Sequence, residues 1–173
     1  MTGPSATPSR SRGSATTPRN PKNCHERALG LLAVRPRARR ELERRLRAAG
    51  FEAGEVADVL ERLERVGLID DRAFARQMAD HHFGTRRAGR RAVESALLAK
   101  GISADLANEV AALAPEDEHE RAIELARSRV RRLAGVEPVK AFGRLTSLLI
   151  RRGYAPDVAR SAARTALEVD DAD

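Results

Sequence analysis

Pairs of apolar residues recur along this chain four positions apart, and each pair is followed by a glycine and then by another apolar residue. On a helix, positions i and i+4 lie on one face, so each pair predicts a short helix with a buried stripe. A glycine just past the helix end adopts positive φ at little cost, and the following apolar residue packs back on the last turn. The three copies are Leu42, Leu46, Gly50 and Phe51; Val93, Leu97, Gly101 and Ile102; and Leu145, Leu149, Gly153 and Tyr154.

Each copy is flanked by two further predicted helices. The helices that follow the glycines are expected to start at Ala53, Ala104 and Pro156, with the inward pairs Val56 and Leu60, Leu106 and Val110, and Val158 and Ala162. The helices that precede the copies are expected over residues 25–34, about 71–82 and 115–134. Their end signals are the N-cap Asn23, the first-turn prolines Pro115 and Pro138, and the stops Gly67 and Gly135.

The period is therefore three helices in roughly fifty residues, which predicts an all-α protein of tandem three-helix repeats. The repeats are placed at residues 24–71, 72–114 and 115–170. Because such a small unit has a limited core, neighbouring repeats are expected to pack in an elongated, curved array. Residues 1–23 are rich in Ser, Thr, Pro and Arg and are predicted to be a disordered basic tail.

Composition supports helix over sheet, since only 3% of the 173 residues are aromatic. No apolar run approaches the roughly 18 residues of a membrane span, and the single Cys24 cannot form an internal disulfide. We therefore predict a cytoplasmic protein with no membrane association. The net charge of +7 concentrates in residues 1–23, which carry +4, and in residues 72–114, which carry +3. This distribution suggests an anionic partner, although a basic surface also serves solubility.

Candidate chemistry is sparse. The segment 84–91 has the glycine spacing of a phosphate-binding loop, but arginines replace its Lys and Ser/Thr and no strand precedes it, so a flexible basic segment is favoured. Cys24 with His25, and His81 with His82, lack the spacing of metal ligands. Asp70 and Asp71 are interpreted as helix-capping residues rather than an acid–base pair. No metal, no cofactor and no enzymatic activity are expected.

Three arginine stripes are candidate contact surfaces. Arg86, Arg87, Arg90 and Arg91 have no nearby acidic balance, so contact with phosphate or an acidic partner and a simple solvated helix start are both open. The stripes Arg40, Arg44 and Arg47, and Arg127, Arg131 and Arg132, are expected to form ion pairs with Glu41, Glu43, Glu120 and Glu124. With few aromatics for stacking, DNA binding is expected to be weak and salt-sensitive.

Several segments together resemble the bacterial RecX regulatory proteins, over about residues 24–168. The most specific is the run Gly67, Leu68, Ile69, Asp70 and Asp71 followed by Phe74 and Ala75. The others are residues 39–51, the stretch Lys100, Gly101 and Ile102, and the run Arg151, Arg152, Gly153 and Tyr154. Ala38 departs from the pattern, because the family usually has a Ser or Thr cap there.

The resemblance implies a non-enzymatic regulator of the RecA recombinase. It would bind the RecA filament on single-stranded DNA, block its growth or promote its loss, and thereby modulate recombination, DNA repair and the SOS response. The alternative is a helical module that binds nucleic acid directly and competes for DNA. A monomer is expected, and the proposed contacts are Arg86, Arg87, Arg90, Arg91, Arg40, Arg44, Arg47, Arg151 and Arg152.

Overall fold

The structure, a computed structural model, describes residues 23–114 and 117–170, and all regular structure in these residues is helical. Almost all of the basic tail predicted at residues 1–23 lies outside this range. The α-helices are α1 (Cys24–Val34), α2 (Arg39–Ala48), α3 (Ala53–Arg65), α4 (Asp71–Gly84), α5 (Arg90–Lys100), α6 (Ala104–Ala112), α7 (Glu118–Val130), α8 (Pro138–Arg151) and α9 (Pro156–Asp170). A short 3-10 helix, η1 (Arg131–Leu133), follows α7.

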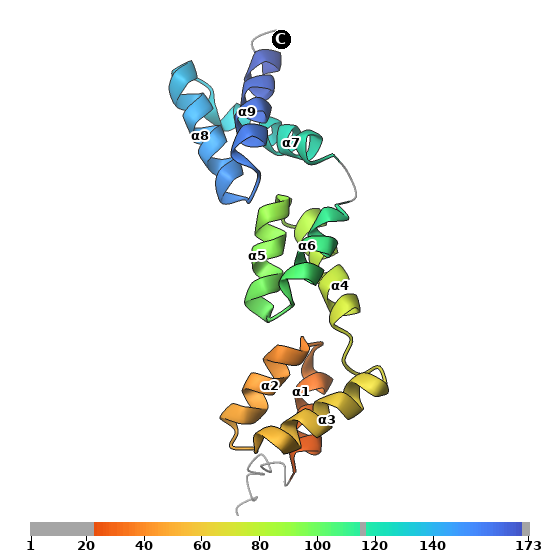
Figure 1. The fold of residues 1–173 in the computed structure, drawn as a ribbon. Helices are drawn as coiled ribbons and strands as arrows, with labels where there is room; N and C mark the ends of the chain where they lie inside the picture. Colours follow the sequence, from red (N-terminus) through yellow and green to blue (C-terminus); the bar gives the residue numbers. More distant parts are fainter. Residues whose placement is uncertain (1–22, 115–116, 171–173) are drawn as a thin grey trace, which may run out of the picture.

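The helices form three successive units, each with its own apolar core. The first unit (α1–α3) packs around Leu42, Leu46 and Leu60, the second (α4–α6) around Val93 and Leu97, and the third (α7–α9) around Leu145, Leu149 and Tyr154. Figure 1 shows the units stacked end to end in an elongated column, from α1–α3 at the bottom to α7–α9 at the top. The second helices α2, α5 and α8 lie along the same side of this column (Figure 1).

The predicted glycine stops are present with the required backbone geometry. Gly50, Gly101 and Gly153 have φ of +93°, +90° and +88°. In each turn the N–H of the next residue donates to the carbonyl of the buried leucine in the last helical turn: Phe51 to Leu46 (3.3 Å), Ile102 to Leu97 (3.2 Å) and Tyr154 to Leu149 (3.1 Å). This hydrogen bond is the Schellman arrangement that the spacing predicts, and it aims the apolar side chain back at the core.

Most of the predicted helix starts are confirmed, and one is wrong. Helices α3, α6 and α9 start at the predicted residues, and Asn23 caps α1 by accepting a hydrogen bond from the Glu26 N–H. Helix α7 begins at Glu118 instead of Pro115, which lies outside the described residues, because Asp117 supplies the N-cap. Helix α4 begins at Asp71, as predicted.

A buried carboxylate organises the start of α2. The side chain of Glu41 is 4% exposed, and its Oε1 atom accepts hydrogen bonds from Arg37 (2.6 Å), Arg35 (2.6 Å) and Arg45 (3.0 Å). Burial by itself would raise the pKa of Glu41, but the three guanidinium hydrogen bonds prevail and lower it. The ionised carboxylate therefore joins the loop before α2 to the first turns of that helix.

Candidate interaction surfaces

The units are joined by a junction that occurs twice with the same parts. In each case the start of the second helix of one unit lies on the glycine turn of the next unit. Ala38, just before α2, is fully buried in the core of the second unit, and a Cβ on Gly101 would lie 2.8 Å from the Cβ of Arg40. At the second junction the Gly89 N–H, just before α5, donates to the Arg152 carbonyl (2.8 Å). The linear array is therefore built by repeating one contact.

Two carboxylates cap helices across these junctions. Ala38 occupies the N-cap of α2 and has no side chain to cap it, but Asp71 Oδ1 from the next unit accepts a hydrogen bond from the Arg39 N–H (2.8 Å). In the same way Glu118 Oε1 accepts from the Arg90 N–H at the start of α5 (2.8 Å). Asp71 and Glu118 are the first residues of α4 and α7, so the cap is part of the repeat.

The two neighbouring aspartates of the predicted capping pair thus serve different helices. Asp70 Oδ1 caps its own helix by accepting from the Ala73 N–H (2.9 Å), whereas Asp71 caps α2 of the preceding unit. Burial raises the pKa of Asp71, and its hydrogen bond with Arg39 acts in the opposite direction. The cap that the Ala38 side chain cannot provide is therefore supplied by a carboxylate from a distant part of the sequence.

Replacing Asp71 with alanine should loosen the first junction specifically. We expect a loss of about 1 kcal/mol of unfolding free energy, the usual cost of removing an N-cap acceptor. Amide hydrogen exchange should become faster at Arg39. Asp70→Ala is the matched control, because it should accelerate exchange at Ala73 and leave Arg39 protected. Unchanged protection of the Arg39 amide in Asp71→Ala would show that the inter-unit cap contributes nothing.

The predicted arginine cluster of residues 86–91 lies at the second junction. Arg86, Arg87, Arg90 and Arg91 are all exposed, and their segment contacts the turn between α8 and α9. The Arg152 guanidinium donates to the Arg86 carbonyl (2.6 Å), and the Tyr154 hydroxyl donates to the Arg87 carbonyl (3.2 Å). The structure therefore brings Arg152 to this cluster from the third repeat, while Arg151 points elsewhere on α8.

The same contacts correct the prediction of a flexible segment at residues 84–91. Gly84 is the last residue of α4 and Arg90 the first of α5. Between them, the N–H groups of Ala88 and Gly89 donate to the carbonyls of His82 (3.0 Å) and Arg152 (2.8 Å). Among the non-glycine residues that the structure describes, Arg87 alone has a positive φ, +47°. The segment is a tight connection fixed between two units, and its arginine side chains project from it.

The predicted ion pairing of the other two stripes is wrong. Within residues 23–114 and 117–170, none of Arg40, Arg44, Arg47, Arg127, Arg131 and Arg132 forms a salt bridge. Glu41 instead binds Arg35, Arg37 and Arg45, because it faces inward while the stripe faces solvent. Arg40, Arg44 and Arg47 line a shallow hollow of about 270 Å³ on α2 together with Glu43.

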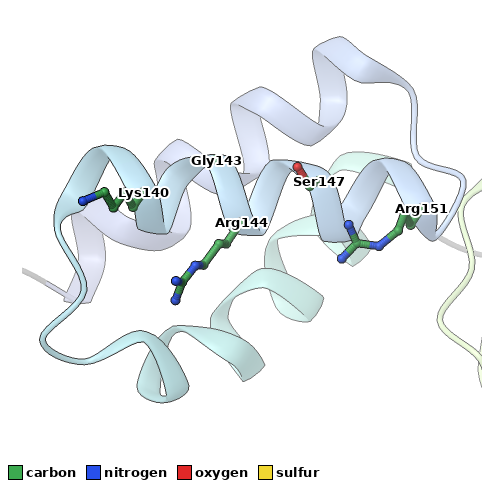
Figure 2. Close-up of a pocket in the computed structure, with 5 residues that line it drawn as sticks. All are labelled: Lys140, Gly143, Arg144, Ser147 and Arg151. Carbon is green, nitrogen blue, oxygen red and sulfur yellow. The ribbon is translucent and has the colours of Figure 1, made fainter.

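Another basic surface lies on α8, and Arg151 is the one residue of it that the sequence analysis proposed as a contact. Lys140, Arg144 and Arg151 line a shallow hollow of about 510 Å³ together with Gly143 and Ser147, as Figure 2 shows. Arg144 and Arg151 also line a second hollow, between α8 and the segment formed by α7 and η1. Its other lining residues are Arg129, Arg132, Leu133, Leu145 and Leu148. The signal in the sequence was the absence of acidic residues from Pro138 to Arg151. This signal is not visible in the net charge of residues 115–173, because their basic and acidic residues balance to zero.

Metal sites and membrane spans are not found in the described parts of the chain. Among the residues that the structure describes, no cluster of three or more His, Cys, Asp or Glu side chains could hold a metal ion. None of the described helices is long and apolar enough to cross a membrane.

Comparison with known proteins gives consistent matches. Residues 24–63 match the family model described as "RecX, first three-helix domain", and residues 70–110 match "RecX, second three-helix domain". The chain is 35% identical to Regulatory protein RecX of Streptomyces coelicolor over 158 residues, covering 90% of this chain and 84% of that protein. It is 40% identical to Regulatory protein RecX of Mycolicibacterium smegmatis over 136 residues, covering 76% and 72%.

A solved structure supports the same fold. The crystal structure of RecX from Lactobacillus salivarius superposes with a TM-score of 0.76 at 20% identity, covering 83% of this chain and 94% of that one. The all-helical array of three-helix units is thus shared with a distant relative.

Proposed function

Because this chain belongs to the RecX family of regulatory proteins, we propose that it regulates the RecA recombinase by binding the RecA filament on single-stranded DNA. Binding would limit filament growth or promote filament loss. RecA ATPase, strand exchange and co-protease activity would fall as a result, with consequences for recombination, DNA repair and the SOS response. No catalytic step by this chain is part of the proposal.

The observation that carries this proposal is the way in which the junctions fix the arginine cluster. Arg86, Arg87, Arg90 and Arg91 are exposed on a connection anchored between the second and third units. A preorganised basic surface loses little conformational entropy when it binds an anionic surface. The three units also form an elongated column (Figure 1), and extended repeat arrays commonly bind along extended partners such as a helical polymer.

The proposal is tested by the single-strand-dependent ATPase of RecA from the same organism. The protein is titrated at two salt concentrations while its binding to naked DNA is followed in parallel. Inhibition at amounts well below RecA, without coverage of the DNA, supports filament regulation. Inhibition only when the protein saturates the strand would identify a competitor for DNA, and the absence of inhibition would refute the RecA assignment.

Replacing the arginine cluster should weaken inhibition without unfolding the protein. For Arg86→Ala, Arg87→Ala, Arg90→Ala and Arg91→Ala combined, we expect about a tenfold rise in the amount needed for half-inhibition, with a smaller salt dependence. The backbone contacts of the segment are retained because alanine keeps the main chain. The control removes four other exposed arginines: Arg27, Arg62, Arg160 and Arg164. Equal losses in the two variants would mean that only net charge matters.

The third helix of each unit argues against the alternative that this protein binds DNA in a sequence-specific way. A recognition helix reads base edges with side chains such as Arg, Asn or Gln near its start. Helices α3, α6 and α9 instead begin with Ala53, Ala104 and Pro156, followed within one turn by Glu55, Asp105 and Asp157. Carboxylates at those positions would repel the phosphates on both sides of a groove.

A further inference from the structure

The hollow on α8 has a lining suited to one class of ligand. Three of its five lining residues, Lys140, Arg144 and Arg151, are cationic. The other two, Gly143 and Ser147, are small, and neither a carboxylate nor an apolar side chain lines it. Figure 2 shows the five residues along one exposed stretch of α8. Cations around small residues let a compact oxyanion approach the helix surface closely.

The cations are free to bind a ligand. In the part of the chain that the structure describes, neither Arg144 nor Arg151 forms a salt bridge, and both are exposed. Lys140 lies 3.1 Å from Glu137, but both side chains are more than half exposed, so this pair contributes little and yields readily to a competing anion. The three positive charges are therefore available together.

Their spacing favours an extended polyanion over a single ion. Lys140, Arg144 and Arg151 follow one another along α8, and at about 1.5 Å per residue the outer two are separated by roughly 16 Å along the helix axis. One phosphate cannot contact both ends of such a row, whereas a nucleic-acid strand carries a charge at every nucleotide. The second hollow adds two further arginines beside this row, Arg129 of α7 and Arg132 of η1.

We propose that the α8 hollow, lined by Lys140, Gly143, Arg144, Ser147 and Arg151, binds the sugar–phosphate backbone of a nucleic-acid strand. The contact is made by guanidinium and ammonium groups to phosphates, with Ser147 as a central hydroxyl donor. No aromatic side chain lines the hollow, so the bases are not stacked and binding does not depend on sequence. The site belongs to the third unit and acts independently of any contact with RecA.

The test places a carboxylate at the centre of the hollow. In Ser147→Glu we expect affinity for a fluorescein-labelled oligothymidylate, measured by anisotropy at low salt, to fall about tenfold. The slope of log K against log salt should also shrink by about 0.7 for each phosphate that the hollow no longer binds. Ser95→Glu is the matched control, since Ser95 precedes Gly101 by as many residues as Ser147 precedes Gly153 and is also exposed on the second helix. It should bind the strand as the unmodified protein does.

A second pair of variants removes equal charge from two helices. Lys140→Ala, Arg144→Ala and Arg151→Ala combined should reduce affinity more than Arg40→Ala, Arg44→Ala and Arg47→Ala combined, because the α2 hollow includes Glu43. Far-UV circular dichroism verifies that each variant is folded.

Three outcomes would overturn the proposal. The first is undiminished binding in Ser147→Glu, and the second is an equal loss in Ser95→Glu. The third is displacement of the strand by polyglutamate at equal charge concentration, which would assign the hollow to an acidic protein. All measurements are made without RecA, so their failure leaves the ATPase test of the proposed function unaffected.

Discussion

Gly153→Ala should detach the third unit from the second. The new Cβ would lie 2.3 Å from the Ala92 Cβ and 2.4 Å from the Ala92 backbone nitrogen, so backbone atoms must move apart. The φ of +88° adds the strain of a left-handed conformation, typically 1–2 kcal/mol. We expect a total loss of about 3 kcal/mol, of which overpacking supplies the remainder.

Tyr154 reports on this junction directly. It is the single tyrosine of a chain without tryptophan, it is 1% exposed, and burial raises the pKa of its phenol. In Gly153→Ala, the phenol should titrate closer to its ordinary value, and tyrosine fluorescence should change at lower urea than far-UV ellipticity. Small-angle scattering should show a larger radius of gyration.

The control for Gly153→Ala is Gly50→Ala. Gly50 ends α2 with nearly the same φ, +93°, but a Cβ there would meet no atom within 4 Å. It should therefore show the conformational cost alone and leave the tyrosine signal unchanged. Gly89→Ala isolates the steric part, because its φ is −77° while its Cβ would lie 2.4 Å from the Tyr154 nitrogen. Equal effects of Gly153→Ala and Gly50→Ala would refute the junction argument.

Glu41→Ala should strongly destabilise the first unit. It would leave the buried guanidinium of Arg37, whose side chain is 7% exposed, without its carboxylate. Arg35 and Arg45 are 40% and 49% exposed and can turn to water. We therefore expect a loss of about 3 kcal/mol, at the lower end of the usual cost of breaking a buried pair. Urea unfolding followed by circular dichroism measures it.

The Glu41 cluster also makes the first unit sensitive to acid. Because the pKa of Glu41 is lower in the folded state than its ordinary value of 4.5, its stabilisation is present above that value and is lost as pH falls through the folded pKa. Glu41→Gln should flatten the fall in stability below pH 4.5.

The control for Glu41→Ala is Glu61→Ala, which removes an exposed carboxylate from an ion pair with Arg65 and should change stability little. If it cost as much as Glu41→Ala, burial would not be the cause. Equal acid sensitivity in Glu41→Gln and the unmodified protein would assign the pH dependence to other carboxylates.

Local signals fixed the helices and their ends in advance. Pairs of leucines at i and i+4, glycines at C′ and polar N-caps act within one or two turns, so the starts at Ala53, Ala104 and Pro156 were predictable from the printed sequence. Where the prediction failed, at the start of α7, two competing signals lay within a few residues and the capping aspartate prevailed. The family was also recognisable from these repeated motifs.

The tertiary structure decided the contacts between units and the position of the basic surfaces. The hydrogen bond from the Arg39 N–H to Asp71 joins residues far apart in sequence, and no periodicity indicates it. Local pairing rules likewise assigned Glu41 to solvent-facing arginines, whereas the fold turns it inward toward Arg37. A net charge counted along the chain adds the residues on all faces of a helix together. The basic surface that includes Lys140 and Arg144 was therefore not evident from a segment whose net charge is zero. The sequence determines short-range geometry, and packing determines which residues from distant parts of the chain meet.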